Sequence, residues 1–332
     1  IFLWQFPACL TNIIPVQCSS EIKSGCGMGE YFVELAGTPE GERLALVLAL
    51  VSAFAHAVFA ALNKGGKTVN NPYLNRGIIN VFYSLMAAPF ALFVFPLPSG
   101  FLIWVLAASF LLHLAYEWLQ SAAFSKGAFT LTYPIARGTG PLMIAILAII
   151  VFAENLSAGQ WVGMILLSGA IISLARINIK EVQLSPVVQS NLIPSILLAI
   201  GAGIFIALYT TVDAYGIRLA ENPFMFLSWF FFLGGFGFPV VAFVHWKGLP
   251  EKPPVKPLVV RGLVGAFVAY FSFATLMLAT RIGNVSEAAA LRETSIIFAT
   301  LIGIFLFREK VSTAKLFVIA LIALGAVLIE FG

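Results

Sequence analysis

The sequence has few charged residues. Asp, Glu, Lys and Arg make up only 10% of its 332 residues, whereas a soluble domain carries about 25%. Hydrophobic residues make up 60% of the chain, and the mean hydropathy is +0.98. This small number of charged side chains cannot give the folded chain a hydrated surface. The chain must therefore be surrounded by lipid. This composition excludes a cytosolic enzyme.

Motifs for metals, nucleotides and covalent catalysis are also lacking. The three cysteines, Cys9, Cys18 and Cys26, precede residue 27, so the apolar part cannot depend on a disulfide framework or a thiolate metal site. No His, Asp or Glu cluster has the spacing of metal ligands, and there is no phosphate-binding loop of the ATPase type. We therefore expect no metal, no cofactor and no enzymatic activity.

The long apolar runs predict an all-α polytopic membrane protein. A helix needs about 20 apolar residues to cross the hydrocarbon core of a bilayer. Ten runs meet this requirement, at residues 43–63, 76–96, 100–123, 127–151, 159–177, 191–213, 223–246, 257–280, 284–307 and 313–331. We therefore predict ten transmembrane helices. Residues 1–42 are interpreted as an N-terminal extension, of which the part before Met28, the first methionine, need not be native.

The two halves of the chain repeat one another. Arg137-Gly138-Thr139 matches Arg292-Glu293-Thr294, 155 positions later. At the same offset, the segment 152–157 matches the segment 307–312. Asn71-Pro72 also matches Asn222-Pro223, at a slightly different offset. We predict two five-helix repeats, residues 43–177 and 191–331. Since an odd number of spans per copy reverses the orientation of the second copy, the repeat is expected to be inverted.

The net charge of +4 does not indicate nucleic-acid binding. Most Lys and Arg residues, Arg76 among them, are assigned to short loops, where they set the orientation of a membrane protein. More of them follow odd-numbered spans than even-numbered ones. By the positive-inside rule this distribution places both termini outside the cytoplasm.

Residues 127–142, Gly-Ala-Phe-Thr-Leu-Thr-Tyr-Pro-Ile-Ala-Arg-Gly-Thr-Gly-Pro-Leu, resemble the fourth-helix signature of EamA-type transporters in the drug/metabolite transporter superfamily. The turns at 152–157 and 307–312 resemble that family's Gly-Glu-Arg-Leu turns, with Ala153 and Arg308 in place of Gly. The resemblance covers residues 43–331. It implies ten helices, two EamA repeats, a central cavity reached from alternate sides, and the cell (inner) membrane. It also implies cytoplasmic termini, opposite to the charge count.

Arg137 is the first candidate site residue. Pro134 and Pro141 flank it, with two glycines between them, so the fourth span is expected to be interrupted. Interrupted membrane helices are tolerated where they line a cavity. A guanidinium suits a carboxylate or phosphate, and Tyr133 shares the face of Arg137. Arg137 is therefore a candidate substrate anchor. The alternative is a buried arginine neutralised by a nearby carboxylate.

Arg292 holds the matching position in the second repeat. Glu293 is adjacent but points about 100° away along the helix. Substrate contact and an internal Arg–Glu pair both remain open for Arg292. Glu287 is interpreted as a helix-start residue that the helix dipole favours.

The third span carries His113, Glu117 and Gln120 on one face. A carboxylate in mid-membrane indicates function by default. One hypothesis is a Glu117–Arg137 pair that acts as a proton-linked switch, with His113 relaying the proton. The alternatives are a static salt bridge and a histidine that is only hydrogen-bonded. On the first span, His56 lies on a polar face, and Asp213 ends a polar stretch of the sixth.

The sequence thus predicts a secondary active transporter, with export as the expected direction. Two symmetry-related arginines favour a small anionic or zwitterionic metabolite, such as an amino acid, an organic acid or a phosphorylated compound. Partners are the solute and membrane lipid but no nucleic acid, with protons as a candidate coupling ion, in a monomer or homodimer. The expected substrate-binding residues are Arg137, Arg292, Tyr133, Glu117, His113, Gln120 and His56.

Two other functions remain open. In the first, the chain exports organic cations or drugs, Glu117 binds the cation, and both arginines are paired internally. In the second, it is a membrane-embedded enzyme acting on lipid. The second needs a metal, a nucleophile or a soluble face, and the sequence supplies none of them clearly.

Overall fold

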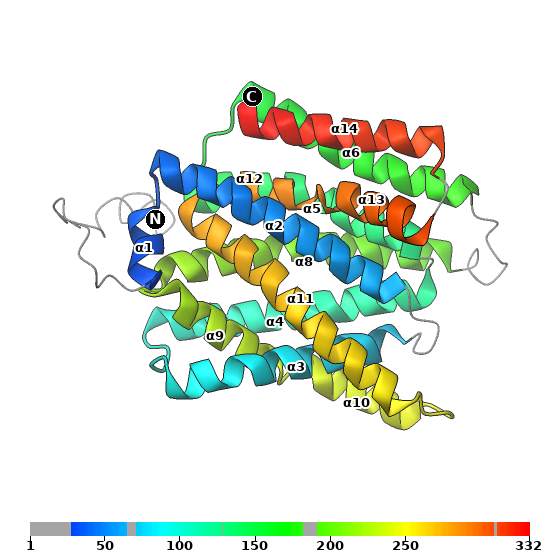
Figure 1. Cartoon of the computed structure of the whole chain (residues 1–332), viewed down its shortest axis with the longest axis horizontal. Coiled ribbons are helices and arrows are strands. Elements are labelled where there is room, and N and C mark those ends of the chain that lie inside the picture. Colours follow the sequence, from blue (N-terminus) through cyan, green and yellow to red (C-terminus); the bar gives the residue numbers. More distant parts are fainter. Residues whose placement is uncertain (1–27, 65–70, 128, 182–190, 309–310) are drawn as a thin grey trace, which may run out of the picture.

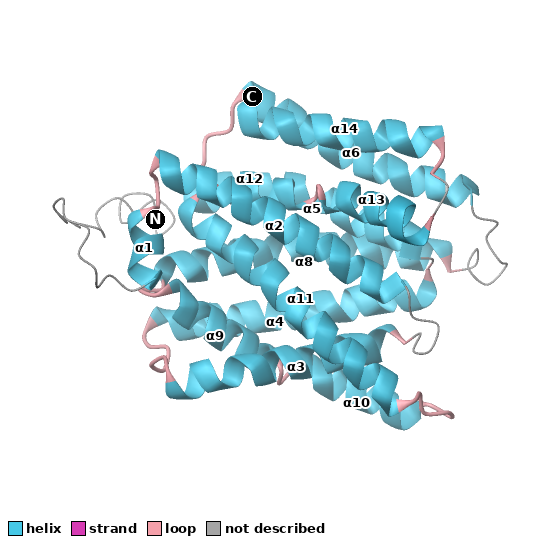
Figure 2. Cartoon of the chain, in the orientation of Figure 1, coloured by secondary structure: helices cyan, strands magenta, loops and turns pink. Residues whose placement is uncertain are grey.

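The computed structural model describes residues 28–64, 71–127, 129–181, 191–308 and 311–332. Within these ranges the chain is helical with short connections and has no strand (Figure 2). The expectations for residues 1–27 lie outside the described residues. The helices are α1 Met28–Glu34, α2 Pro39–Lys64, α3 Pro72–Phe93, α4 Phe101–Lys126, α5 Phe129–Phe152, α6 Ala158–Glu181, α8 Leu192–Leu219, α9 Pro223–Gly234, α10 Phe238–Gly248, α11 Val255–Ile282, α12 Val285–Arg292, α13 Ser295–Phe307 and α14 Thr313–Phe331.

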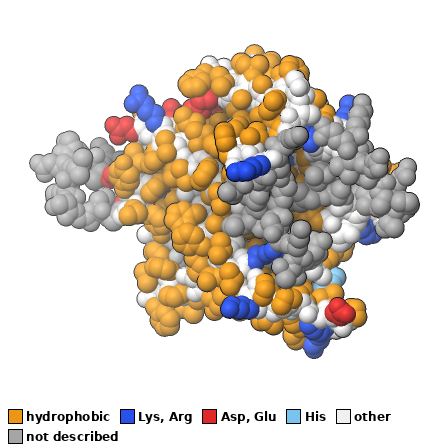
Figure 3. Space-filling view, turned by 45° about the vertical axis from the view of Figure 1, so that its right-hand side comes forward, with side chains coloured by type: hydrophobic (Ala, Val, Ile, Leu, Met, Phe, Trp, Pro, Cys, Tyr) orange, Lys and Arg blue, Asp and Glu red, His pale blue; other side chains and the backbone are white. Residues whose placement is uncertain are grey.

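Ten helical segments of the described chain are long and apolar enough to cross a membrane. Two of them are formed by pairs of shorter helices, α9 with α10 and α12 with α13. Large hydrophobic side chains such as Phe93, Trp104 and Phe305 are exposed, and Figure 3 shows wide areas of such side chains between the charged ones. The prediction of an all-α polytopic membrane protein with ten spans is confirmed.

The helices lie side by side in an order that brings the two halves together (Figure 1). Helix α6 packs on α14 at one edge, and α3 packs on α9 and α10 at the other. Between these edges, α4 packs on α8, and α2 packs on α11. Gly163 and Gly325 face each other across α6 and α14, and a Cβ on either would lie within 2.9 Å of the other's carbonyl oxygen. Small residues thus allow the close backbone approach typical of membrane helices.

The turns after α5 and α13 have the same unusual backbone. Ala153 has φ 54° and Arg308 has φ 53°, and no other non-glycine residue in the described ranges has positive φ. An L-residue in this left-handed region costs roughly 1–2 kcal/mol relative to the right-handed one. The two residues are 155 positions apart, so the sequence repeat is accompanied by matching turn geometry at these positions.

The predicted interruption of the fourth span is wrong. Helix α5 runs from Phe129 to Phe152 through both Pro134 and Pro141. Gly138 permits close packing: a Cβ there would lie 2.8 Å from Ile172 of α6. The prolines each remove a backbone donor, but the packing of α5 on α6 and α8 keeps the helix continuous.

The seventh and ninth spans are broken instead. Between α9 and α10, a Cβ on Gly235 would lie 2.3 Å from Ser84 of α3, and the Ser84 hydroxyl donates to the Phe232 carbonyl at 2.7 Å. Between α12 and α13, the amides of Glu293 and Thr294 bond three residues back, each at 3.0 Å. Such a tightened turn within a helix often marks a functional hinge.

Candidate functional site

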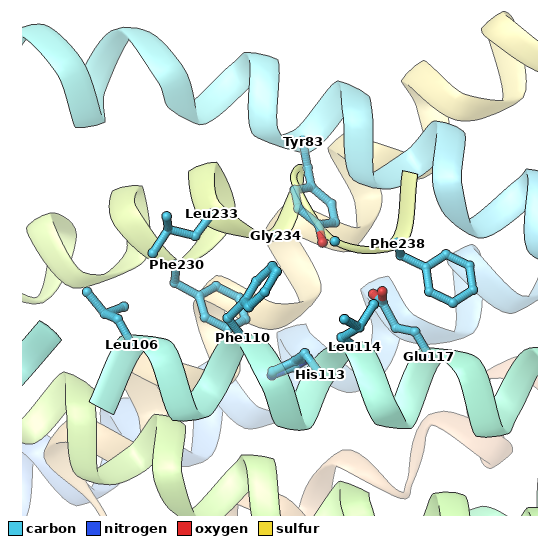
Figure 4. Close-up of a pocket in the computed structure, with 11 residues that line it drawn as sticks. Tyr83, Leu106, Phe110, His113, Leu114, Glu117, Phe230, Leu233, Gly234 and Phe238 are labelled. Atoms are coloured by element: carbon cyan, nitrogen blue, oxygen red, sulfur yellow. The ribbon is translucent and has the colours of Figure 1, made fainter. Parts of the chain in front are cut away.

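A cleft lies between α3, α4 and the broken α9–α10 span (Figure 4). Its cavity volume is about 20 Å³, and it is partly open to the outside. Tyr83 of α3 and Glu117 of α4 point into the space between their helices, and Phe110, Phe230 and His113 contribute rings to its wall. The cleft therefore combines one carboxylate with an aromatic lining, and the interrupted helix lies where the chain lines a cavity.

Glu117 is held by α3. Its carboxylate accepts from Asn80 Nδ2 at 2.8 Å and lies 4.0 Å from Arg76 Nε. Arg76 also donates to Gln120 Oε1 at 2.5 Å, and Gln120 Nε2 donates to the Tyr116 hydroxyl at 2.7 Å. The hypothetical pairing of Glu117 with Arg137 is wrong, because Arg76 is the cation beside this carboxylate.

The prediction that Arg76 lies in a loop is also wrong, and a helix cap explains why. The Asn71 side chain accepts from the amides of Tyr73 at 3.0 Å and Leu74 at 3.2 Å. Together with Pro72 at the first helical position, this cap starts α3 at residue 72. Arg76 therefore falls within the helix, with Asn80 one turn further along the same face.

Arg137 and Glu293 form a buried ion pair between α5 and the hinge of the ninth span. Arg137 Nε lies 3.1 Å from Glu293 Oε2, and the two residues are 3% and 4% exposed. The geometry is that of a charge contact, because neither atom makes a hydrogen bond within the described residues. As expected, Glu293 does not pair with its neighbour Arg292. The alternative of a neutralised buried arginine is what the structure shows for Arg137.

Arg292, in contrast, lacks a carboxylate. It is 3% exposed, and no carboxylate of the described residues lies within ion-pair distance of it. Its guanidinium lies 4.5 Å from the Phe273 ring centroid, and Nη2 lies 3.4 Å from His56 Nδ1. In the described part of the chain, Arg292 Nε has no hydrogen-bond partner. The His56 ring stacks on Tyr133, with centroids 6.5 Å apart.

A third polar group centres on Asp213 of α8. Its carboxylate accepts from Ser109 Oγ at 2.5 Å and lies 2.7 Å from His113 Nε2. The Tyr209 ring packs on His113, with centroids 4.0 Å apart, and on Tyr116 at 5.1 Å. Asp213 and Tyr209 also line a second, smaller cavity between α8 and α11.

The structure thus divides the expected site residues between two neighbouring groups. Glu117, His113 and Gln120 lie at the cleft or beside it, whereas Arg137, Arg292, Tyr133 and His56 form the arginine group. Phe273 joins the groups, because its ring contacts both His113 at 6.1 Å and the Arg292 guanidinium. Sequence reasoning missed Arg76, Asn80, Ser109 and Phe273, and noticed Asp213 only as a polar residue of the sixth span.

Polar contacts join helix ends at one end of the molecule, one set between the two halves and one set within the second half. Glu154 accepts from the Val285 amide at 2.6 Å and the Ser286 amide at 3.2 Å, which caps the start of α12. Arg218 of α8 donates to the Thr280 and Gly283 carbonyls at the end of α11, at 2.8 and 2.7 Å. Arg281 of α11 donates back to the Ile217 and Arg218 carbonyls at the end of α8. These crossed contacts satisfy carbonyls that helix ends leave open.

Glu287 serves the start of α12. It accepts from Asn284 Nδ2 at 2.9 Å and from Gln160 Nε2 at 2.6 Å. These contacts agree with its interpretation as a helix-start residue. Within the described ranges, no group of three or more His, Cys, Asp or Glu side chains is placed to hold a metal ion.

The fold and the buried polar groups define a multi-pass membrane protein with ten helices. Residues 193–331 match the EamA-like transporter family. A crystal structure of a protein with 17% sequence identity has a TM-score of 0.69 to this chain, and the match covers 86% of this chain and 96% of that one. At this identity the likeness shows the fold. No curated protein matches the chain. The predicted resemblance to EamA-type transporters of the drug/metabolite transporter superfamily is confirmed over residues 193–331.

Proposed function

We propose that the chain is a secondary transporter, in the cell (inner) membrane, for a small solute with an anionic group, and that Arg292 anchors this group. The solute is an anion or a zwitterion of the size of an amino acid, an organic acid or a small phosphorylated compound. Arg137, Tyr133 and His56 surround the anchor, and Glu117, His113 and Gln120 lie towards the cleft. Export is the proposed direction.

The observation that carries this proposal is the unpaired charge of Arg292. A buried charge without a counter-charge is costly in a membrane protein. Arg137 has Glu293 as its partner and Arg76 has Glu117, whereas Arg292 faces a neutral ring and an imidazole. A carboxylate or phosphate of the solute would supply the missing partner, and a guanidinium binds both in two-point geometry.

Alternating access between two inverted repeats is the proposed mechanism. The helix contacts support an inverted repeat. Helices α4 and α11 are the third spans of their halves, and α2 and α8 are the first spans. Each third span packs on the first span of the other half, α4 on α8 and α11 on α2. Packing of α5 on α8 corresponds in the same way to that of α13 on α2. The crossed Arg218 and Arg281 contacts, which lie within the second half, would keep one side closed, and opening of that side would separate the end of α8 from the end of α11.

A second candidate function is export of organic cations, with Glu117 as the cation site. It is favoured by the aromatic lining of the cleft, since Tyr83, Phe110 and Phe230 lie near the carboxylate, and aromatic faces attract cations. Against it, Glu117 already has Arg76 and Asn80 as partners. The arginine site therefore remains the first candidate.

Thermal unfolding of the purified protein in detergent distinguishes the two functions. A solute that binds only the folded protein raises its stability by mass action. We expect glutamate, lactate or inorganic phosphate to raise the unfolding temperature of the parent protein and of Glu117→Gln, but not of Arg292→Gln. Stabilisation by tetraethylammonium that is lost in Glu117→Gln and retained in Arg292→Gln would establish the cation function instead.

A further inference from the structure

We propose that His113 and Asp213 form a proton-binding site whose protonation compensates for the charge of an anion at Arg292, so that one proton moves with each monoanionic solute. This inference rests on the proposed function and assigns its coupling ion. It gives Asp213 and Ser109 a role beyond packing, and it places the proton on a histidine–aspartate pair instead of on Glu117.

The geometry sets which nitrogen of His113 takes the proton. The Asp213 carboxylate can only accept hydrogen bonds, so the 2.7 Å contact makes His113 Nε2 the donor. Nδ1 of the neutral ring is then the basic nitrogen. A proton from water binds at Nδ1 while the Nε2–H bond to Asp213 stays in place, and release reverses this step. The Ser109 hydroxyl donates a second hydrogen bond to the Asp213 carboxylate and orients it.

The pair lies between two cavities, the cleft and the smaller cavity beside α8. His113 lines the cleft between α3 and α4, whereas Asp213 lines the smaller cavity between α8 and α11. Asp213 is 3% exposed and Ser109 is fully buried. A histidine–carboxylate bond that separates two cavities is placed to accept a proton on one side and release it towards the other.

The charges of these buried groups cancel when the site is unprotonated and no anion is bound. Arg76, Arg137 and Arg292 supply three positive charges. Glu117, Glu293 and Asp213 supply three negative ones, and a neutral His113 adds none. An anion bound at Arg292 would leave one negative charge in excess, and protonation of His113 removes it. Because uncompensated charge in the membrane is costly, anion binding and proton binding favour each other.

Phe273 places the two sites next to one another. Its ring centroid lies 4.5 Å from the Arg292 guanidinium carbon and 6.1 Å from the His113 ring centroid. Nearby helices α9, α10 and α11 present apolar rings at this point. The charged and titratable groups nearest the pair are Glu117 and Tyr116 of α4, Tyr209 of α8 and Tyr83 of α3. Arg76 of α3 lies beyond Glu117, and Arg292 of α12 lies beyond Phe273.

Nitrogen NMR of the full chain, labelled with ¹⁵N-histidine and reconstituted in phosphatidylcholine vesicles, tests the inference without any solute. The chain has three histidines, so His113 is identified by the signal missing in His113→Gln, and the exposed His245 is an internal reference. The nitrogen signals of His113 report whether its ring binds a proton. Arg292→Gln, which removes one positive charge as an anion would, should raise the midpoint of the His113 titration by about one pH unit, a tenfold gain in proton affinity.

Three further variants complete the test. Arg292→Lys keeps the charge and should leave the midpoint unchanged. Asp213→Asn should lower the proton affinity of His113 at least tenfold. Ser109→Ala leaves the carboxylate in place but removes one of its donors, so it should raise the proton affinity of His113. This variant serves as the test if Asp213→Asn does not fold. An unchanged midpoint in Arg292→Gln, or a His113 signal that does not titrate, would overturn the inference. Stabilisation by anions that still depends on Arg292 would then show that the proposed function stands without this coupling.

Discussion

At the scale of single residues, the two arginines at matching positions of the repeats, Arg137 and Arg292, have different surroundings. Arg137 is neutralised by Glu293, whereas Arg292 lies against Phe273 and His56 without a carboxylate. The difference arises because successive side chains on a helix point about 100° apart. Glu293 therefore turns away from its neighbour towards α5. One acidic residue in the second repeat thus neutralises the arginine of the first and leaves its own arginine open.

The ion pair of Arg137 and Glu293 gives the first prediction at this scale. Replacing only one partner, as in Glu293→Gln, leaves a buried arginine without its counter-charge and should destabilise the protein by about 3–5 kcal/mol. Replacing both partners, as in Arg137→Met with Glu293→Leu, should restore most of the stability, because the pair lacks hydrogen-bond geometry. Thermal unfolding in detergent measures both. A double variant as unstable as the single one would contradict this account.

At the scale of elements, the turns after α5 and α13 hold non-glycine residues in the left-handed region. Ala153→Gly and Arg308→Gly should each stabilise the protein by about 1 kcal/mol, because glycine adopts positive φ without a steric penalty. Ala108→Gly, at an exposed position inside α4, is the matched control and should destabilise by a similar amount. Equal losses of stability in all three variants would mean that these turns carry no strain.

The break between α9 and α10 depends on close contact with α3. A Cβ on Gly235 would meet Ser84 at 2.3 Å, whereas one on Gly169 of α6 would meet nothing within 4 Å. Gly235→Ala should therefore lower the unfolding temperature and deform the cleft, while Gly169→Ala should raise it, because alanine is favoured over glycine inside helices by about 1 kcal/mol. Thermal unfolding measures the stability of both variants. If the Gly235→Ala protein is as stable as the Gly169→Ala protein, the contact between Gly235 and Ser84 is not tight enough to require glycine.

The sequence predicted the existence of all ten spans because long apolar runs in lipid leave a chain few alternatives to helices. Where spans break was not predictable in the same way. Pro134 and Pro141 indicated a break that packing of α5 prevents, whereas the turn at Glu293 and Thr294 contains no proline or glycine. Partners across helices were equally hidden. The Asn71-Pro72 cap signal, however, was present and would have placed Arg76 in the helix beside Glu117.

At the scale of the whole molecule, Arg218 and Arg281 hold the ends of α8 and α11 together. Arg281→Ala removes its donors to the end of α8 and should favour opening of this side about tenfold, the effect of one to two hydrogen bonds. The measurement is maleimide labelling of Thr280→Cys, at a buried position, in a background where Cys9, Cys18 and Cys26 are serine.

Arg261→Ala, towards the opposite end of α11, is the control for this labelling and should leave its rate unchanged. If Arg281→Ala also leaves the rate unchanged, the crossed contacts do not close the molecule at this end. If both variants accelerate labelling equally, the effect is a general loosening of α11.

Solute exchange in proteoliposomes tests the central claim most directly, that Arg292 anchors an anionic group. The radiolabelled solute is the one among glutamate, lactate and inorganic phosphate that most raises the unfolding temperature. The account predicts exchange by the parent protein, reduced exchange by Arg292→Lys, and none above protein-free vesicles by folded Arg292→Gln. Exchange by Arg292→Gln at the rate of the parent protein would contradict it.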